Sequence, residues 1–248
     1  MKRKILMSVL VCLFILGTCM GAVREISVSN TVNGRELPIY SVETEAKQVA
    51  LSFDATWGNE YMKQILDVLD KYDVKATFFL TGNWVGKYPE DVKQIQLARH
   101  DIGNHSENHK AMSQLSKEAC KEEIVSVHEK VKALTGIEMK LFRVPYGDYD
   151  DQVIRTAKAC GYEVIQWSID SQDWKDYGKE SIVKTILKNK ELKSGIILMH
   201  SGAKYTKDAL ESVILGLREQ GYELVPVSEL IYKENYHLDV TGRQIKNK

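Results

Sequence analysis

The sequence predicts a single α/β domain built on a parallel sheet of about seven strands, either open or closed into a barrel. Short apolar runs alternate with amphipathic helical patterns along the chain, which favours parallel strands covered by helices. Polar residues with catalytic potential directly follow several of these runs, and α/β barrels place their active sites at such strand ends. No internal repeat and no linker rich in Gly, Ser or Pro divides the region.

The strands are predicted from apolar runs bounded by polar or turn residues. In chain order they are Val49–Phe53, Ala76–Leu80, a minimal Asp101–Gly103, Leu141–Arg143, Glu163–Trp167, Gly195–Met199 and Glu223–Val227.

Helices are predicted where apolar residues recur three and four positions apart. They are Glu60–Tyr72, Glu90–Ala98, Lys117–Leu134, Asp151–Cys160, Ser181–Lys190 and Lys207–Gln220. Gly136, Gly161 and Gly221 directly follow three of them, where a left-handed backbone commonly ends a helix.

The first 23 residues have the pattern of a targeting segment. Lys2, Arg3 and Lys4 precede an uncharged, mostly apolar stretch, Ile5–Val23, whose length lies between a signal-peptide core and a transmembrane helix. Cleavage after Ala22 would place Met20, a large residue, at −3. We therefore expect an uncleaved membrane anchor with the domain outside the cytoplasmic membrane. A cleaved, secreted form is the alternative.

The remaining boundaries follow from composition. Residues 24–46 are predicted to be a linker and an edge hairpin, 47–232 the main domain, and 233–248 a polar tail that frays.

Charge and cysteine content exclude some partners and bonds. Formal net charge is zero and no basic stripe carries interleaved aromatic residues, so we expect no nucleic-acid partner. Cys120 and Cys160 lie in helical patterns, where a small buried residue is favoured over a disulfide.

Two histidines four residues apart, His105 and His109, are the most distinctive local pattern. On a helical turn they would share a face and bind one divalent cation. Solvated histidines also occur at this spacing, so the surrounding residues must decide between a metal site and a solvated pair. His100 is predicted to be a surface or loop residue, and His128 and His237 are predicted to be structural or solvated.

Asp54 and His200 each end a predicted strand. A carboxylate at Asp54 suits a general base acting on a metal-bound water. Its alternative role, capping the helix that begins near Glu60, is disfavoured because six residues is too far. His200 suits a general acid, although a lone histidine at a strand end is also commonly buried and hydrogen-bonded.

Two loops add further candidates. Arg143 could hold a carboxylate in bidentate geometry, while Pro145 fixes its loop and the backbone N–H of Tyr146 could face an oxyanion. Asp173 beside Trp174 suits a sugar site, since an indole face packs on a pyranose ring. Ordinary turns explain either loop in isolation.

Taken together, these residues resemble the polysaccharide deacetylases with a NodB homology domain, carbohydrate esterase family 4. The resemblance runs from about Val49 to Val227 and follows the five motifs of the family in order. They are Ser52-Phe53-Asp54-Ala55, His105-Ser106-x-x-His109, Arg143-Val144-Pro145-Tyr146, Asp170-x-x-Asp173-Trp174 and Ile196-x-Leu198-Met199-His200. The resemblance implies a distorted (β/α) barrel and metal-dependent removal of N-acetyl groups from peptidoglycan or chitin-like polysaccharide.

The same resemblance implies a role for each matching residue. Asp54 would be the base and Arg143 its clamp, His105 and His109 the metal ligands, and His200 the acid tuned by Asp173. Substrate contacts would come from Pro145, Tyr146, Trp174 and Leu198, the last two lining the acetyl pocket. Zinc is the expected ion, with cobalt or another divalent ion as alternatives.

Ala55 departs from the family pattern. Members usually carry a second aspartate there as a metal ligand, and a methyl group cannot replace it. The Asp-Ala-x-Trp-Gly form resembles a sporulation-associated branch of spore-forming bacteria. We expect weak metal binding, with Thr56, Asn59 and Glu60 as neighbours that could fill the place.

Three other functions compete with deacetylation. A glycan-binding pseudoenzyme would keep the groove and lose the metal with Ala55. A zincin-type peptidase needs Glu directly after the first histidine, where this chain has Ser106. A glycosidase using Asp54 and Asp173 would leave the histidine pair unexplained.

Overall fold

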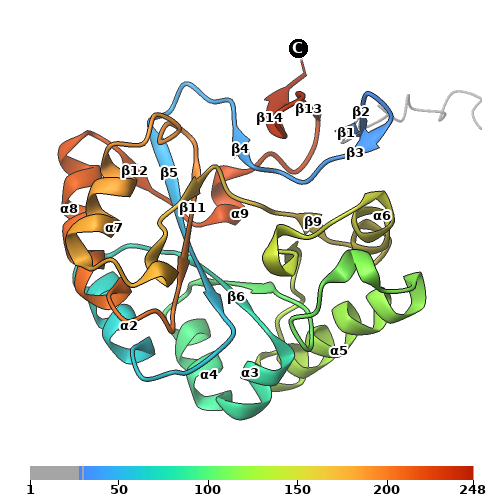
Figure 1. Cartoon of the computed structure of the whole chain (residues 1–248), viewed down its shortest axis with the longest axis horizontal. Helices are drawn as coiled ribbons and strands as arrows, with labels where there is room; N and C mark the ends of the chain where they lie inside the picture. The colour runs from blue at the N-terminus through green and yellow to red at the C-terminus, as the bar shows by residue number, and fades with distance from the viewer. Residues whose placement is uncertain (1–27, 30, 248) are drawn as a thin grey trace, which may run out of the picture.

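The computed structural model describes residues 28–29 and 31–247. Its centre is a parallel sheet of eight strands in the order β10-β11-β5-β6-β7-β8-β9, with β12 pairing with the start of β5 (Figure 1). The strands are β5 (Gln48–Ala55), β6 (Thr77–Leu80), β7 (Asp101–Asn104), β8 (Leu141–Phe142), β9 (Glu163–Val164), β10 (Ile169–Asp170), β11 (Ile196–His200) and β12 (Glu223–Leu224). The prediction of a distorted barrel of about seven parallel strands is confirmed.

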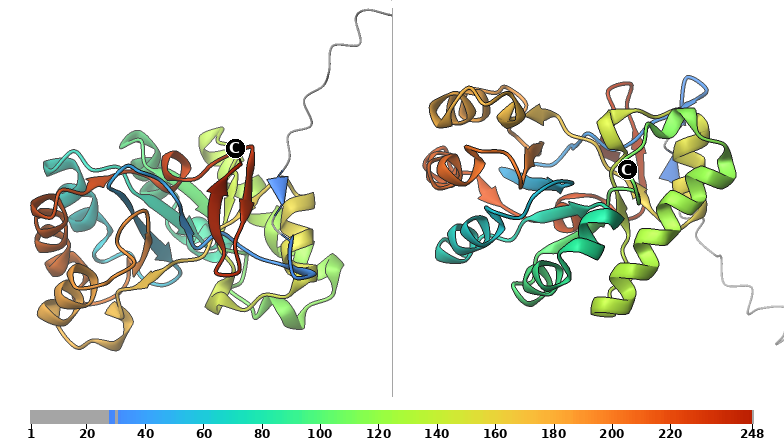
Figure 2. Two further views of the ribbon diagram at one scale, coloured as in Figure 1. Left: turned by 90° about the horizontal axis from the view of Figure 1, so that it is seen from above. Right: turned by 60° about the horizontal axis from the view of Figure 1, so that its bottom comes forward.

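Helices surround this sheet on its outer side, as Figures 1 and 2 show. They are α2 (Met62–Lys71), α3 (Gly82–Lys87), α4 (Pro89–Leu97), α5 (Lys117–Thr135), α6 (Asp151–Ala159), α7 (Lys179–Leu187) and α8 (Thr206–Glu219). A further helix, α9 (Val227–Leu230), packs two of its residues with the side chains inside the barrel. Short 3-10 turns are η1 (Met112–Gln114), η2 (Pro145–Gly147) and η3 (Asp173–Lys175). Gly136, Gly161 and Gly221 adopt the predicted left-handed backbone. Within residues 31–247, no helix is long and apolar enough to cross a membrane. The predicted anchor, residues 1–23, lies outside the described part of the chain.

The alternation of side chains along β5 separates two hydrophobic cores. Leu51 and Phe53 pack in the core between the strands and the helices, whereas Ala50 packs in the barrel interior. Because successive side chains of a strand point to opposite faces, Ser52 and Asp54 share the interior face with Ala50. The first strand therefore directs Asp54 towards the mouth of the barrel.

A second sheet bridges β9, one end strand of the barrel, and the start of β11. It has the order β1 (Val28–Ser29), β13 (Tyr236–Leu238), β14 (Arg243–Lys246) and β4 (Ser41–Val42). The chain before β4 bonds to one barrel edge, since Ile39 N donates to Val164 O at 2.8 Å. Within β4, Val42 N donates to Ser194 O, just before β11, at 3.0 Å. A separate hairpin, β2 (Thr31–Val32) with β3 (Arg35–Glu36), precedes this segment.

The prediction that residues 233–248 fray is wrong. The segment forms β13 and β14, and Tyr236 and Leu238 are buried in the interior core beside Ile39 and Ile165. The alternation of these two residues with the exposed His237 is the period of a half-buried strand.

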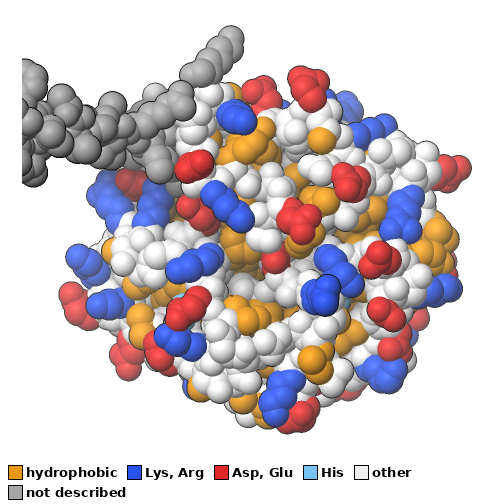
Figure 3. All heavy atoms as spheres, turned by 180° about the vertical axis from the view of Figure 1, so that it is seen from behind, with side chains coloured by type: hydrophobic (Ala, Val, Ile, Leu, Met, Phe, Trp, Pro, Cys, Tyr) orange, Lys and Arg blue, Asp and Glu red, His pale blue; other side chains and the backbone are white. Residues whose placement is uncertain are grey.

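Acidic and basic side chains intersperse over the face of the molecule that Figure 3 shows.

Candidate active site

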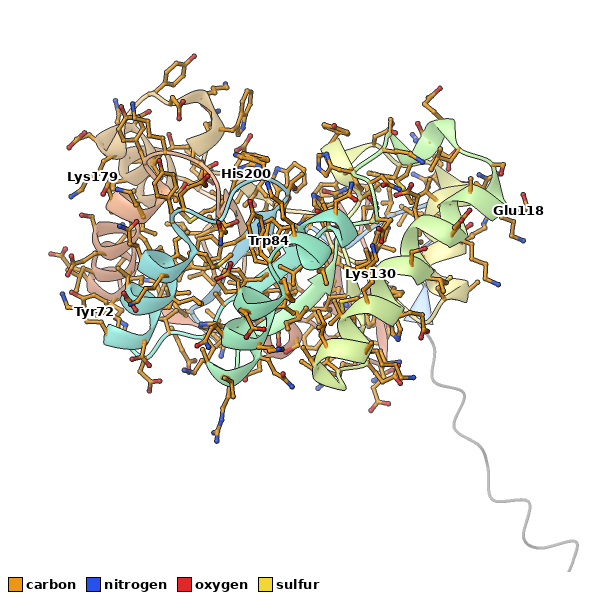
Figure 4. The ribbon with its side chains drawn as sticks, turned by 90° about the horizontal axis from the view of Figure 1, so that it is seen from below. Tyr72, Trp84, Glu118, Lys130, Lys179 and His200 are labelled. Carbon is orange, nitrogen blue, oxygen red and sulfur yellow. The ribbon has the colours of Figure 1, made fainter. Side chains whose placement is uncertain are left out.

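The candidate residues gather at the carboxyl ends of the barrel strands. Asp54 is the second-last residue of β5 and His200 is the last residue of β11, and the two occupy paired positions of these adjacent strands. His105 follows β7, Arg143 follows β8, and Asp173 lies on η3 after β10. Figure 4 shows His200 at the middle of one rim, whereas Tyr72, Lys179 and Glu118 lie towards the periphery.

A fully buried arginine fixes the Asp54 carboxylate. Arg143 Nη1 donates to Asp54 Oδ1 at 2.8 Å, and Nη2 donates to Ser52 Oγ at 2.8 Å and to Gln166 O at 3.2 Å. The guanidinium also lies 4.1 Å from the centre of the Phe79 ring. Burial raises the pKa of Asp54, but the charge and hydrogen bond of Arg143, together with the charge of His200, outweigh it and leave the pKa below its usual value. The carboxylate is therefore ionised near neutral pH.

His105 is held as a neutral imidazole with one nitrogen free for a ligand. Its Nδ1–H donates to Arg143 O at 2.8 Å, and burial lowers its pKa despite the nearby Asp54 charge. In this tautomer Nε2 carries a lone pair, and it faces Asp54 Oδ2 at 3.4 Å. Two acceptors that face each other suit an added cation, and a backbone carbonyl that orients the other nitrogen is typical of metal-binding histidines.

His109 reaches the same place from an irregular loop. The two rings lie 4.9 Å apart between centroids, so the structure brings the pair together. The expectation of a shared helical turn is wrong, because Ser106 and His109 have left-handed backbones with φ of 66° and 54°. Burial lowers the pKa of His109 to about 4. Two neutral imidazoles therefore fit a divalent cation.

Hydrogen bonds from three elements hold this loop. Glu123 of α5 is buried, and its carboxylate accepts from Asn108 N at 2.7 Å, Asn108 Nδ2 at 2.8 Å and Lys110 Nζ at 2.9 Å. At the start of α3, Gly82 N donates to Ser106 O at 3.0 Å. On β7, Asn104 Oδ1 accepts from Ser106 N at 2.9 Å. These bonds offset the cost of left-handed non-glycine residues.

His200 is fixed by a buried carboxylate. Its Nδ1–H donates to Asp173 Oδ1 at 2.7 Å, and its backbone N donates to Asp173 Oδ2 at 2.7 Å. Thr206 Oγ1 also donates to Asp173 Oδ2, at 2.6 Å. Burial lowers the pKa of His200, but the hydrogen bond and charge of Asp173, with Asp54 and Asp170, raise it above its usual value. The imidazolium is thus favoured, with Nε2–H left for substrate.

The predicted substrate contacts lie around this centre. Leu198 is buried on the interior face of β11. It lies two residues before His200 and on the same face of the strand. Pro145 is buried at the start of η2. The neighbouring Tyr146 is exposed, and its ring lies edge-on to His109 with the two ring centroids 4.4 Å apart. Trp174 is exposed on η3.

A family model described as "Polysaccharide deacetylase" matches residues 41–165, a stretch that contains β5 to β9 and both predicted metal ligands. The chain belongs to the polysaccharide deacetylase family. The family predicted from the five motifs is therefore confirmed, and with it the assignment to hydrolases of carbon–nitrogen bonds.

Relatives of this family deacetylate peptidoglycan sugars. The chain is 38% identical over 198 residues to a peptidoglycan-N-acetylglucosamine deacetylase of Bacillus cereus, covering 77% of this chain and 92% of that protein. It is 32% identical over 203 residues to the peptidoglycan-N-acetylmuramic acid deacetylase PdaA of Bacillus subtilis, covering 80% and 77%. The uncharacterized protein YlxY of Bacillus subtilis is 35% identical over 194 residues, which span 60% of its length.

Solved structures of the family include one without activity. A carbohydrate esterase family 4 pseudoenzyme from Bacillus anthracis has a TM-score of 0.76 and 32% identity, covering 84% of this chain and 70% of that one. A mutant of this pseudoenzyme with restored enzymatic activity has the same TM-score and identity. The fold of this deacetylase-family chain is thus shared by active and inactive proteins.

Ala55, where the family pattern has a second aspartate, is fully buried and belongs to the core between strands and helices. Asn59 is one of the neighbours considered as a replacement for the missing ligand. Its side chain is already engaged elsewhere, because Asn59 Nδ2 donates a hydrogen bond to Asp91 Oδ2 at 2.7 Å. Thr56 Oγ1 is buried without a hydrogen-bond partner among the described residues. Residues 31–247 contain no group of three His, Cys, Asp or Glu placed to hold a metal.

Sequence reasoning missed two residues that contact the candidate site. Trp57 stacks on His200 with centroids 5.4 Å apart and planes at 27°, and Glu123 holds the loop of His109. Trp57 lies three residues after Asp54, so its position in the first motif was a usable signal. Glu123 gave none, because an acidic residue on a helix is usually solvated.

The histidines outside the site are structural. The expectation of a surface position for His100 is wrong, since it is buried with Nδ1 accepting from Ala76 N at 3.2 Å. His128 Nδ1 bonds to the Tyr162 hydroxyl at 2.6 Å. Cys120 and Cys160 are free thiols, as favoured.

Proposed function

We propose that this protein is a metal-dependent hydrolase that removes N-acetyl groups from peptidoglycan sugars. One observation carries the proposal: an ionised Asp54, 3.4 Å from the free nitrogen of His105, stands at the strand position paired with the protonated His200. A deprotonated base, Asp54, and a protonated acid, His200, therefore face the same small site, as general acid–base hydrolysis of an amide requires. The relatives that act on peptidoglycan support the substrate class.

Each residue contributes one part of the chemistry. His105 and His109 would hold the divalent ion, and when bound it would supply Lewis-acid activation of the attacking water and of the acetyl carbonyl. Asp54 accepts the proton of the attacking water, and Arg143 keeps the carboxylate aimed. His200 donates its Nε2 proton to the leaving amine. Leu198 and Trp174 would enclose the acetyl group, and the N–H of Tyr146 would donate to the oxyanion.

The test is acetate release from peptidoglycan and from acetylated chitooligosaccharides. The chain is stripped of metal with a chelator and assayed alone, with Zn²⁺ and with Co²⁺, beside Asp54→Asn as the inactive control. Metal-restored release that is lost in Asp54→Asn is the expected result. No release with any ion, from a chain that still binds glycan, would contradict the proposal.

That second outcome defines the alternative, a glycan-binding pseudoenzyme of the same fold. Ala55 supports it, because one anionic ligand of the family pattern is missing, and so does the likeness to the Bacillus anthracis pseudoenzyme. The alternative predicts glycan binding that neither Zn²⁺ nor a chelator changes.

We also propose that residues 1–23 anchor the domain at the outer face of the membrane. The uncharged run after Lys2-Arg3-Lys4 and the large residue Met20 near the possible cleavage site support this. Mass spectrometry of the protein from its host is the test, and a mature chain that begins near Val23 would contradict the anchor.

We further propose a role in sporulation, which the Asp-Ala-x-Trp-Gly form of the first motif supports. Expression confined to vegetative growth would contradict this role.

A further inference from the structure

Among residues 31–247, the most exposed aromatic side chains lie around one end of the barrel. Trp57, Tyr146, Trp174 and Tyr177 are 45%, 71%, 53% and 69% exposed. Trp57 follows β5, Tyr146 follows β8, and the other two follow β10, all at carboxyl ends of parallel strands. The other large hydrophobic residues exposed to this degree in the described chain are aliphatic: Leu97, Val125, Leu215 and Val240. Exposed indole and phenol rings limited to this rim favour stacking on sugar rings there.

Two of these rings flank the reacting groups on opposite sides. Trp57 stacks on His200 of β11, and Tyr146 contacts His109 in the loop after β7. In the sheet, β11 and β7 lie on either side of β5, which carries Asp54. A glycan with its reacting sugar over Asp54 therefore places neighbouring sugars towards Trp57 and Tyr146.

The loop that carries Trp57 is fastened on both sides of the ring. Before it, Thr81 N donates to Ala55 O at 3.2 Å; after it, the indole of the buried Trp84 donates to Gly58 O at 2.7 Å. The ring itself depends on a glycine, because a Cβ at Gly202 would lie 2.6 Å from Trp57 Nε1 and 2.4 Å from Trp57 O. A half-exposed ring held this firmly loses little entropy when a ligand stacks on it.

We propose that Trp57 is the stacking platform of a second sugar subsite, next to the sugar that reacts. The proposal rests on the proposed function for its substrate class. The ligand is an N-acetylated glycan of several sugars, and the C–H face of a pyranose packs on the exposed part of the indole. The site then selects internal sugars of a chain over single sugars.

Binding of metal-stripped full chain to sugars of different length tests this, measured by calorimetry and by tryptophan fluorescence. The ligands are N-acetylglucosamine and its β-1,4-linked tetramer. We expect Trp57→Ala to weaken tetramer binding about 10-fold, the usual cost of truncating an aromatic anchor, with little effect on the monomer. Trp57→Phe should restore most of the loss.

Leu215→Ala is the matched control, because this exposed aliphatic residue lies on α8 outside the site and should bind the tetramer like the parent chain. Thermal unfolding of each variant checks that it is folded. Equal binding of the tetramer by Trp57→Ala and the parent, an equal loss for monomer and tetramer, or no tetramer binding by the parent would each overturn the proposal. Binding needs no turnover, so the two proposals can fail separately. If the parent chain releases no acetate but Trp57→Ala still loses affinity for the tetramer alone, the proposed activity is wrong and the sugar subsite stands.

Discussion

Asp54 and Arg143 show how single residues prepare the site before any ligand arrives. The carboxylate is buried, which alone would favour its neutral form, yet a fully buried guanidinium keeps it ionised. Breaking such a pair leaves an unpaired buried charge, at a cost of about 3–5 kcal/mol. The clamp therefore serves both stability and the protonation state of the base.

At Ala55 the first prediction concerns metal affinity. Ala55→Asp restores the family's third ligand and should tighten Zn²⁺ binding at least ~10–100-fold, the scale of losses seen even for indirect partners of a metal site. Because position 55 is fully buried, the variant should be less stable than the parent without metal and recover with it. Calorimetric titration and thermal unfolding, with Ala55→Asn as the neutral control, measure both effects. Equally tight binding by the parent would show that another group, such as Thr56, already fills the place.

His200 and Asp173 lead to a prediction about pH. Asp173 raises the pKa of His200, so the acid form persists to higher pH than in a free imidazole. Asp173→Asn removes that charge, and the alkaline limb of the kcat/KM profile should move to lower pH. His200→Ala should lower kcat by ~10²–10⁴-fold at all pH values. A profile unchanged in Asp173→Asn would show that another group sets the alkaline limb.

The loop after β7 is set by contacts between elements. Its histidines were predicted to lie on a helical turn, and the structure instead uses left-handed residues fastened to α3, α5 and β7. Local sequence contains the ligand spacing but not these bonds, since Glu123 is 15 residues from Asn108. The strand ends that carry Asp54 and His200 were predictable because apolar runs mark them directly.

Glu123 supplies the prediction at this scale. Glu123→Gln replaces one carboxylate oxygen by a donor that faces Asn108 or Lys110, so the loop of His109 should loosen. We expect Zn²⁺ affinity to fall ~10–100-fold, as for other partners that orient metal ligands. Glu122→Gln, an exposed change on the same helix, is the control and should bind like the parent. The same affinity in both variants would mean that α3 and β7 suffice to hold the loop.

For the whole molecule, the parallel sheet could be predicted and its closure could not. Strand–helix alternation is visible in any window of the chain, and it identified the fold class. The second sheet joins residues 28–42 to residues 236–246, and the polar composition of both segments concealed the alternation of Tyr236 and Leu238. Long-range pairing of short strands leaves little periodic signal.

This closure should carry a measurable part of the stability. Leu238 is buried in the interior core, so Leu238→Ala should lower the free energy of unfolding by about 2–5 kcal/mol. His237→Ala, on the exposed side of the same strand, should change it by less than about 0.5 kcal/mol. Urea unfolding followed by circular dichroism compares the two. A small effect for both would mean that the second sheet unfolds independently of the barrel.

The segment at residues 39–42 also limits the order in which the chain can assemble. It bonds to Val164 of β9 and to Ser194 just before β11, while β4 within it pairs with β14. During synthesis these partners emerge in succession, and β14 only after every barrel strand has been made. Pairing across such separations is slow, because loop closure costs entropy before the contacts form. A nascent barrel thus remains unsealed, with apolar interior surface open to chaperones, until the last strand arrives.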